Sequence, residues 1–128
     1  MQAPVDEVRL MLEVGCVYRY ARRFREARDI FQGVRALVPT REVADLALAG
    51  VSLDEGKLDE AEDYCRRALA LNRASAPAYA QLAEIQLLKN SPASARQSLQ
   101  RSLELSPNGP SAILAKTFLT LSSMASKS

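Results

Sequence analysis

The sequence predicts an all-α fold made of three stacked helix pairs followed by a closing helix. The strongest observation is an internal repeat, because Ala27, Ala61 and Ala95 recur at intervals of 34 residues. Each interval contains two blocks of apolar residues at helical spacing, separated by helix-breaking residues. No window alternates apolar and polar residues in the manner of a half-buried strand, so strands are not expected.

The repeat divides the chain into equivalent segments. The predicted repeats are 8–41, 42–75 and 76–109, within a single domain spanning 1–128. Breaking residues then set the ends of the predicted helices, which are 8–21, 24–38, 42–55, 58–72, 76–89 and 92–106. Gly56 should end one helix as a left-handed cap. Asn90-Ser91-Pro92 should end another and start the next, with Ser91 as the N-cap and Pro92 in the first turn.

Small residues recur at the same place in both helices of each pair. Helices approach closely only where the side chains between them are short, so these residues should face each other. The expected pairs are Gly15 with Ala27, Ala49 with Ala61, and Ala83 with Ala95. The larger side chains of Phe31, Cys65 and Leu99 should then point into the space between successive pairs.

A further helical pattern follows the third repeat. Asn108-Gly109-Pro110 breaks the chain, and Ser111–Met124 carries an apolar face with Ile113, Leu114, Phe118 and Leu121 on or near it. We expect a capping helix at 110–124, because the last pair of a stack would otherwise expose an apolar face to water. The tail Ala125–Ser128 should be frayed.

The period of 34 residues and this set of small positions resemble the tetratricopeptide repeat family, over residues 8–109. The resemblance implies a right-handed α-α superhelix, the tetratricopeptide solenoid. The chain departs from the family at the first-helix tryptophan position, which holds Met11, Asp45 and Tyr79. A later aromatic position holds Tyr18, Ser52 and Gln86.

In that family the first helices of successive repeats line a concave groove that binds other polypeptides. The resemblance assigns the groove to Arg9, Leu12, Cys16, Arg19, Tyr20, Val43, Leu46, Ala47, Gly50, Leu53, Asp54, Ala80, Gln81, Glu84, Leu87 and Leu88. Some members clamp a terminal carboxylate with basic and amide side chains, but here the middle of the groove is small and aliphatic.

The groove composition favours an extended peptide or an amphipathic helix with apolar anchors. Leu12, Leu46, Leu53 and Leu87 would contact the anchors, with Gly50 and Ala80 leaving room for them. Arg9, Arg19, Asp54 and Glu84 would fix the register at the rim. Any single leucine at helical spacing is more often part of a core. The groove could also take the chain's own N-terminal segment or a second copy of the protein.

Charge is unevenly distributed along a chain whose formal net charge is +2. Residues 1–41 contain eight arginines and five acids, giving +3, and residues 42–75 contain four basic and eight acidic residues, giving −4. The basic run around Arg22 and the acidic run around Glu55 flank equivalent turns of adjacent repeats. Mutual screening of these turns is the simplest interpretation, and nucleic acid is not an expected partner because the acidic turn would repel it.

The composition excludes most catalytic sites. There is no histidine, so histidine-dependent nucleophiles, general bases and zinc sites are ruled out. Cys16 and Cys65 are far apart in sequence, so a thiolate metal site or disulfide framework is not expected. Cys65 should be buried, and Cys16 lies on the face assigned to the groove. We predict no cofactor, no metal and no membrane insertion, since neither a secretory leader nor an apolar span is present, and therefore a cytoplasmic location.

These observations favour a non-enzymatic module that binds a segment of another protein. Three repeats and a closing helix in a short chain look like the small chaperones of bacterial type III secretion, which hold translocator or needle subunits before export. The alternative is a structural subunit of a larger bacterial complex, docked through its charged edge and final helix.

Overall fold

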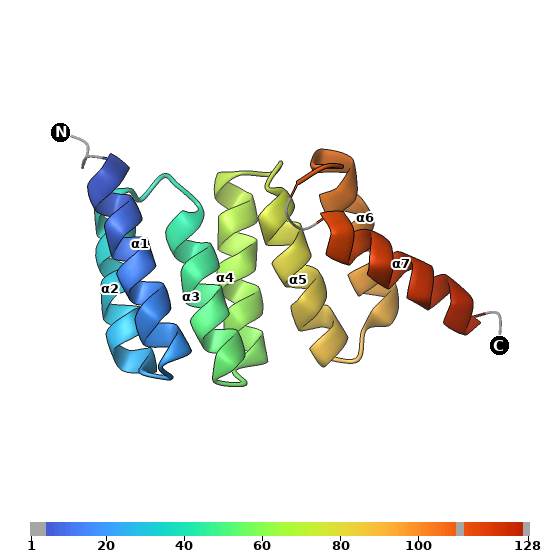
Figure 1. Cartoon of the computed structure of the whole chain (residues 1–128), viewed down its shortest axis with the longest axis horizontal. Helices are drawn as coiled ribbons and strands as arrows, with labels where there is room; N and C mark the ends of the chain where they lie inside the picture. Colours follow the sequence, from blue (N-terminus) through green and yellow to red (C-terminus); the bar gives the residue numbers. More distant parts are fainter. Residues whose placement is uncertain (1–4, 110–111, 127–128) are drawn as a thin grey trace. The chain divides into compact units, whose positions relative to one another are not determined.

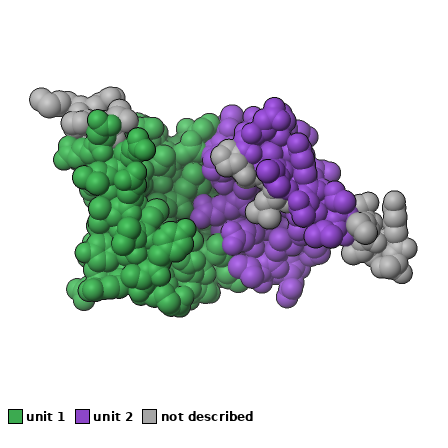
Figure 2. Space-filling view, in the orientation of Figure 1, with its two compact units in different colours: residues 1–72 green, residues 73–128 purple. Residues whose placement is uncertain are grey.

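The computed structural model describes residues 5–109 and 112–126, and within them every regular element is an α-helix. The chain divides into two compact units, residues 1–72 and 73–128, which Figure 2 colours separately. Each unit is described by itself below. The predicted all-α fold is therefore confirmed, while the single domain 1–128 remains a prediction.

Unit 1 contains two helix pairs. Its helices are α1 (Val5–Tyr20), α2 (Phe24–Leu37), α3 (Val43–Asp54) and α4 (Leu58–Leu71). Figure 1 shows them lying side by side and running in alternate directions. Helix α1 begins three residues before the predicted start at residue 8, where Asp6 and Glu7 in the first turn favour helix through the macrodipole. The other three helices agree with the predicted ranges to within one residue at each end.

Unit 2 contains the third pair and the closing helix. Its helices are α5 (Ala76–Leu88), α6 (Pro92–Leu105) and α7 (Ala112–Ser126). Helix α5 begins at a cap that the sequence reading missed, because the Ser75 hydroxyl accepts a hydrogen bond of 3.2 Å from the Ala78 backbone N–H. Ser91 occupies the predicted N-cap position of α6, but its side chain makes no capping hydrogen bond.

The turn inside each pair has the same backbone conformation in all three repeats. Arg22, Gly56 and Asn90 are the left-handed residues, with φ of 60°, 76° and 59°, and they are 34 positions apart. The residue after each one donates a backbone hydrogen bond of 2.8 to 2.9 Å to the carbonyl five positions earlier. This pattern closes the preceding helix. The predicted cap at Gly56 is confirmed, and the other two turns reproduce it with non-glycine residues.

The core of unit 1 lies between its two helix pairs. One buried cluster contains Ala27, Phe31, Leu48 and Val51, which places Phe31 between successive pairs as predicted. A Cβ added at Gly15 would overlap the Phe31 ring, which is the nearest side chain to this position. The facing of Gly15 and Ala27 stays a prediction. Glycine is needed at position 15 because the ring occupies the space that a side chain would fill.

A second cluster of unit 1 contains Val8, Val34 and Ala44, and Met11 packs against it. Ala49, Ala61 and Cys65 are also fully buried. The buried position of Cys65 was predicted.

The core of unit 2 contains Ala83, Ala95, Leu99 and Ala115. The small pair Ala83 and Ala95 and the larger Leu99 are therefore packed in one cluster, as the repeat predicts. Leu99 fills the space between α6 and the closing helix α7, which contributes Ala115.

The closing helix buries only part of the face expected for it. Ala112 and Ala115 are buried and Phe118 is half-buried, whereas Ile113 and Leu121 are 77% and 60% exposed. Helix α7 approaches α6 through Ala115, with Phe118 and Leu119 packed beside it, so Ile113 and Leu121 remain outside. Pro110, Ser111, the side chain of Leu114, the exposure of the tail after Leu121, and the end of the chain at 127–128 lie outside what the structure describes.

Candidate functional site

The residues assigned to the groove divide between the two units. Eleven lie in unit 1, all on α1 and α3, and five lie on α5 in unit 2.

An ion pair joins the C-terminal ends of α1 and α3. Arg19 donates through Nε to Asp54 Oδ2 at 2.5 Å and through Nη2 to Asp54 Oδ1 at 3.1 Å. This two-point geometry fixes both side chains more firmly than a single contact would. Both are about one-third exposed, at 33% and 32%. The hydrogen bond to Asp54 raises the pKa of Arg19, which keeps its positive charge.

The guanidinium of Arg19 also covers Gly50. A Cβ at Gly50 would lie 2.6 Å from Arg19 Nη1, the nitrogen that takes no part in the ion pair. The expectation that Gly50 leaves room for an apolar anchor is therefore wrong. The space above this glycine is filled by a flat cationic group held in place by Asp54.

Leucines flank this covered glycine along α3. Leu46 and Leu53 are both half-buried, one turn before and one turn after Gly50. Along this face of α3, Leu46 is therefore followed by the Arg19 guanidinium over Gly50 and then by Leu53. Other residues assigned to the groove belong to the core, since Leu12 and Ala47 pack on the Phe31 cluster and Val43 packs on the Val34 cluster.

Three of the α1 residues assigned to the groove are exposed to solvent. Cys16 is exposed, and Tyr20 is 88% exposed at the end of the helix. Arg9 is exposed and donates to Glu13 at 3.3 Å along the same helix. The part of the predicted set that forms a connected, accessible face is therefore Cys16, Arg19, Leu46, Leu53 and Asp54, called here the α1–α3 face.

The set in unit 2 lies on α5 and is more exposed. Leu87 and Leu88 are 36% and 56% exposed. Ala80 and Gln81 are half-buried, and Glu84 is exposed. These residues lie along the helix, with the larger apolar side chains at its C-terminal end.

A second polar network joins the two pairs of unit 1. Arg28 on α2 donates to Glu55 at 2.5 Å and to Glu60 at 2.9 Å, and the Ser52 hydroxyl donates to Glu60 at 2.7 Å. The hydrogen bond from Ser52, followed by that from Arg28, lowers the pKa of Glu60. The predicted screening of a basic turn by an acidic one is confirmed, and it extends to Arg19 and Asp54.

Asp45 is a buried carboxylate that the sequence reading noted only as a departure from the family pattern. Its side chain is 4% exposed, and Oδ1 is buried without a hydrogen-bond partner, 3.9 Å from Arg35 Nε. Burial raises the pKa of Asp45, and the charges of Arg35 and Arg67 oppose this shift. The signal in the sequence was a carboxylate at a position where the repeat elsewhere holds methionine or tyrosine.

The described parts of the chain contain neither a metal-ligand cluster nor a membrane-spanning helix. No group of three or more carboxylate or thiol side chains there could hold a metal ion. No helix among residues 5–109 and 112–126 has the length and apolar character needed to span a bilayer.

Comparisons with known proteins agree with this architecture. The profile of a family described as tetratricopeptide repeat matches residues 52–117, which is just over half of the chain. No curated protein matched. The first tetratricopeptide domain of Spaghetti (RPAP3), solved bound to the HSP90 peptide SRMEEVD, is 25% identical with a TM-score of 0.78, covering 100% of this chain and 99% of that one.

Bacterial chaperones also share the fold. The type III secretion translocator chaperone SycD of Yersinia enterocolitica is 17% identical with a TM-score of 0.83, covering 98% of each chain. PcrH, solved in complex with the chaperone-binding region of PopB, is 16% identical with a TM-score of 0.76, covering 92% of this chain and 99% of that one.

Proposed function

The chain belongs to the tetratricopeptide repeat family, and we propose that it is a non-enzymatic interaction module whose α1–α3 face binds a segment of another protein. The observation that carries the proposal is the succession of Leu46, the Arg19 guanidinium and Leu53 along one accessible face. Solved proteins of the same fold and length bind peptides of HSP90 and of the translocator YopD.

The chemistry of this face indicates what it would bind. Leu46 and Leu53 can each contact an apolar side chain of the ligand. Arg19 has Nη1 outside its ion pair, so it can donate to a backbone carbonyl that lies between those two contacts. A peptide or helix with apolar residues on either side of an exposed carbonyl fits this pattern. The α5 set, with Leu87 and Leu88, would offer further apolar contacts.

The same chemistry disfavours a ligand that depends on a terminal carboxylate. Leu12 is part of the packed core and Cys16 is uncharged, so α1 places no cation at the middle of the face. The one arginine there already binds Asp54 through two nitrogens. We therefore propose binding through apolar anchors. A narrower role as a type III secretion chaperone in the cytoplasm is supported by the shared fold and length of SycD and PcrH.

Two available peptides distinguish these ligand types. Fluorescence anisotropy would measure binding of the YopD peptide from the SycD complex and of the HSP90 peptide SRMEEVD. The proposal predicts that the YopD peptide binds more tightly, and that Leu46→Glu weakens its binding at least tenfold by placing a charge on the face. Ile113→Glu on α7, also an apolar-to-acid change, is the matched control and should bind normally.

Circular dichroism would confirm that both variants are folded. Tighter binding of SRMEEVD, or equal binding of the YopD peptide by wild type and a folded Leu46→Glu variant, would contradict the proposed ligand and site.

A further inference from the structure

Helix α1 exposes a row of aliphatic side chains on the side away from the α1–α3 face. Leu10, Val14 and Val17 are 59%, 39% and 66% exposed. Their spacing of four and three residues places them on one stripe of the helix. Cys16 and Arg19 lie on the opposite side, because each residue advances about 100° around an α-helix. We call Leu10, Val14 and Val17 the outer stripe.

The equivalent residues of the second repeat show how such a stripe packs. Positions 34 residues later are Ala44, Leu48 and Val51 on α3, and all three are fully buried. Ala44 packs with Val34, and the other two pack with Ala27 and Phe31, all on α2. The outer stripe is therefore the stacking face of the first repeat, and no helix among the described residues covers it as α2 covers α3.

The geometry of this internal example restricts the missing partner. Helices α2 and α3 are consecutive and run in opposite directions, as Figure 1 shows. The face is thus suited to an antiparallel helix with apolar residues at intervals of three and four. Helix α1 has this pattern itself, so the outer stripes of two copies can pack on each other around a two-fold axis near Val14.

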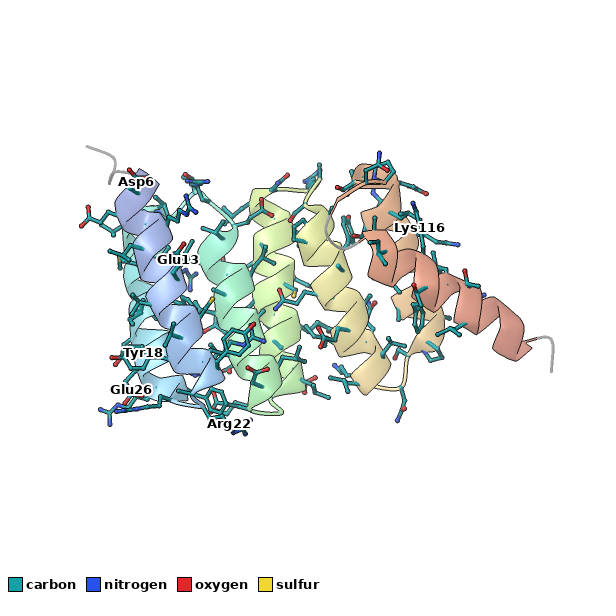
Figure 3. All side chains as sticks on the ribbon, viewed as in Figure 1. Asp6, Glu13, Tyr18, Arg22, Glu26 and Lys116 are labelled. Carbon is teal, nitrogen blue, oxygen red and sulfur yellow. The ribbon has the colours of Figure 1, made fainter. Side chains whose placement is uncertain are left out.

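The charged residues at the two ends of α1 also favour an antiparallel pair. Asp6 and Glu7 are exposed in the first turn of α1, and Arg22 and Arg25 are exposed just beyond its last turn. Figure 3 shows Asp6 and Arg22 at opposite ends of the helix. An antiparallel pair brings the acidic end of one copy to the basic end of the other, whereas a parallel pair would bring like charges together. Glu13, beside the stripe, is paired with Arg9.

We propose that the outer stripe is a self-association surface, through which two copies of this chain pair their α1 helices antiparallel. The contact consists of a single helix from each copy, so it falls below the roughly 1,200 Å² buried in standard stable complexes. The dimer should accordingly dissociate on dilution. The α1–α3 face stays open in this arrangement, so self-association and peptide binding are independent.

Sedimentation velocity over a range of concentrations tests the proposal with the full chain. Wild type should show a monomer–dimer equilibrium, and Val14→Glu, which places two acids near the two-fold axis, should raise the dissociation constant roughly tenfold or more. Ile113→Glu on α7 and Leu46→Glu on the α1–α3 face are matched controls that should dimerise normally. Val14 is exposed in the monomer, so the variant should keep its helical circular dichroism spectrum.

Charge reversal tests the antiparallel orientation separately. Glu7→Arg should weaken the dimer by placing cations at both ends of the pair. Adding Arg22→Asp, which suits the left-handed backbone at that position, should restore it. A wild-type chain that stays monomeric at every concentration would overturn the proposal and leave the stripe to a helix of another protein. A dimer unaffected by Val14→Glu, or one that Arg22→Asp fails to rescue, would overturn it equally.

Discussion

Units 1 and 2 contain the same repeat but join their helices with different chemistry. In unit 1 the polar contacts are ionic, with Arg19 bound to Asp54 and Arg28 bound to Glu55 and Glu60. In unit 2 the buried polar contacts are neutral, because Ser98 donates to Gln86 at 2.7 Å and Ser102 donates to the Ala76 carbonyl at 2.8 Å. The small residues and the left-handed turn are common to both.

One position of the repeat shows how the contact chemistry differs between equivalent residues. Tyr18, Ser52 and Gln86 occupy equivalent places near the end of the first helix. Tyr18 packs on the Phe31 cluster, Ser52 donates to Glu60, and Gln86 accepts from Ser98. Ser52 and Gln86 each reach the second helix of their own pair, and Tyr18 packs on a cluster to which α2 contributes. The repeat therefore requires a contact at this place, and the chemistry of the contact varies.

The largest expected effect tests what the two units share. Ala61→Leu in unit 1 and Ala95→Leu in unit 2 each add a side chain at a fully buried position. Overpacking should lower the free energy of unfolding by about 1–3 kcal/mol in both. Urea denaturation followed by circular dichroism would measure this. An unchanged stability of either variant would show that the small residues do not set the helix spacing.

The next effect concerns the neutral contacts of unit 2. Ser98→Ala removes the donor to Gln86 Oε1 and leaves a buried acceptor without it. The loss should be about 1–2 kcal/mol, and it should be the same at low and high salt because no net charge is involved. A loss that changes with ionic strength would contradict the neutral character of this contact.

The corresponding substitution in unit 1 should cause a loss of stability that depends on salt concentration. Arg28→Gln removes the cation from a network whose members are partly exposed, with Arg28 and Glu55 each 22% exposed. We expect a loss of about 1 kcal/mol at low ionic strength, falling as salt screens the charges. Urea midpoints at low and high sodium chloride, compared with those of Ser98→Ala, would separate the two kinds of contact.

A smaller effect, a gain in stability, is expected when Asp45 is replaced. Burial raises its pKa, so the folded chain keeps a proton that the unfolded chain loses between the two pKa values. Stability contributed by this group therefore falls as pH rises through that window. Asp45→Asn should stabilise unit 1 by up to about 1 kcal/mol at pH 7, and the gain should vanish in acid, where wild-type Asp45 is protonated. A variant less stable than wild type at pH 7 would show that Asp45 is stabilised by Arg35 and Arg67.

The sequence was sufficient for the helices and insufficient for the side-chain contacts of the site. Breakers and the repeat predicted most helix ends to within one residue, because Gly56 and Pro92 act through local backbone geometry. Arg19 and Asp54 were both assigned to the rim, but their pairing joins residues 35 positions apart and depends on how α1 and α3 approach. The covering of Gly50 follows from the same pairing and could not be read from composition.

The buried face of α7 illustrates a second limit. Hydrophobicity predicted contacts through Ile113, Phe118 and Leu121. The helix packs through Ala112, Ala115 and Phe118, and it leaves Ile113 and Leu121 exposed. Close approach of two helices favours small residues over the most apolar ones. Hydrophobicity alone therefore identified the contact of Phe118 and missed the two buried alanines.

The proposal that the α1–α3 face holds a polypeptide can be tested with a reporter already in the chain. Cys16 is exposed on this face, and Cys65 is buried in the core and serves as the internal reference. Alkylation of each cysteine by N-ethylmaleimide would be followed by mass spectrometry with and without a saturating YopD peptide. We expect the peptide to slow modification of Cys16 severalfold, with Cys65 unmodified in both cases. Cys16 modified at the same rate in the peptide-bound chain would place the binding site elsewhere.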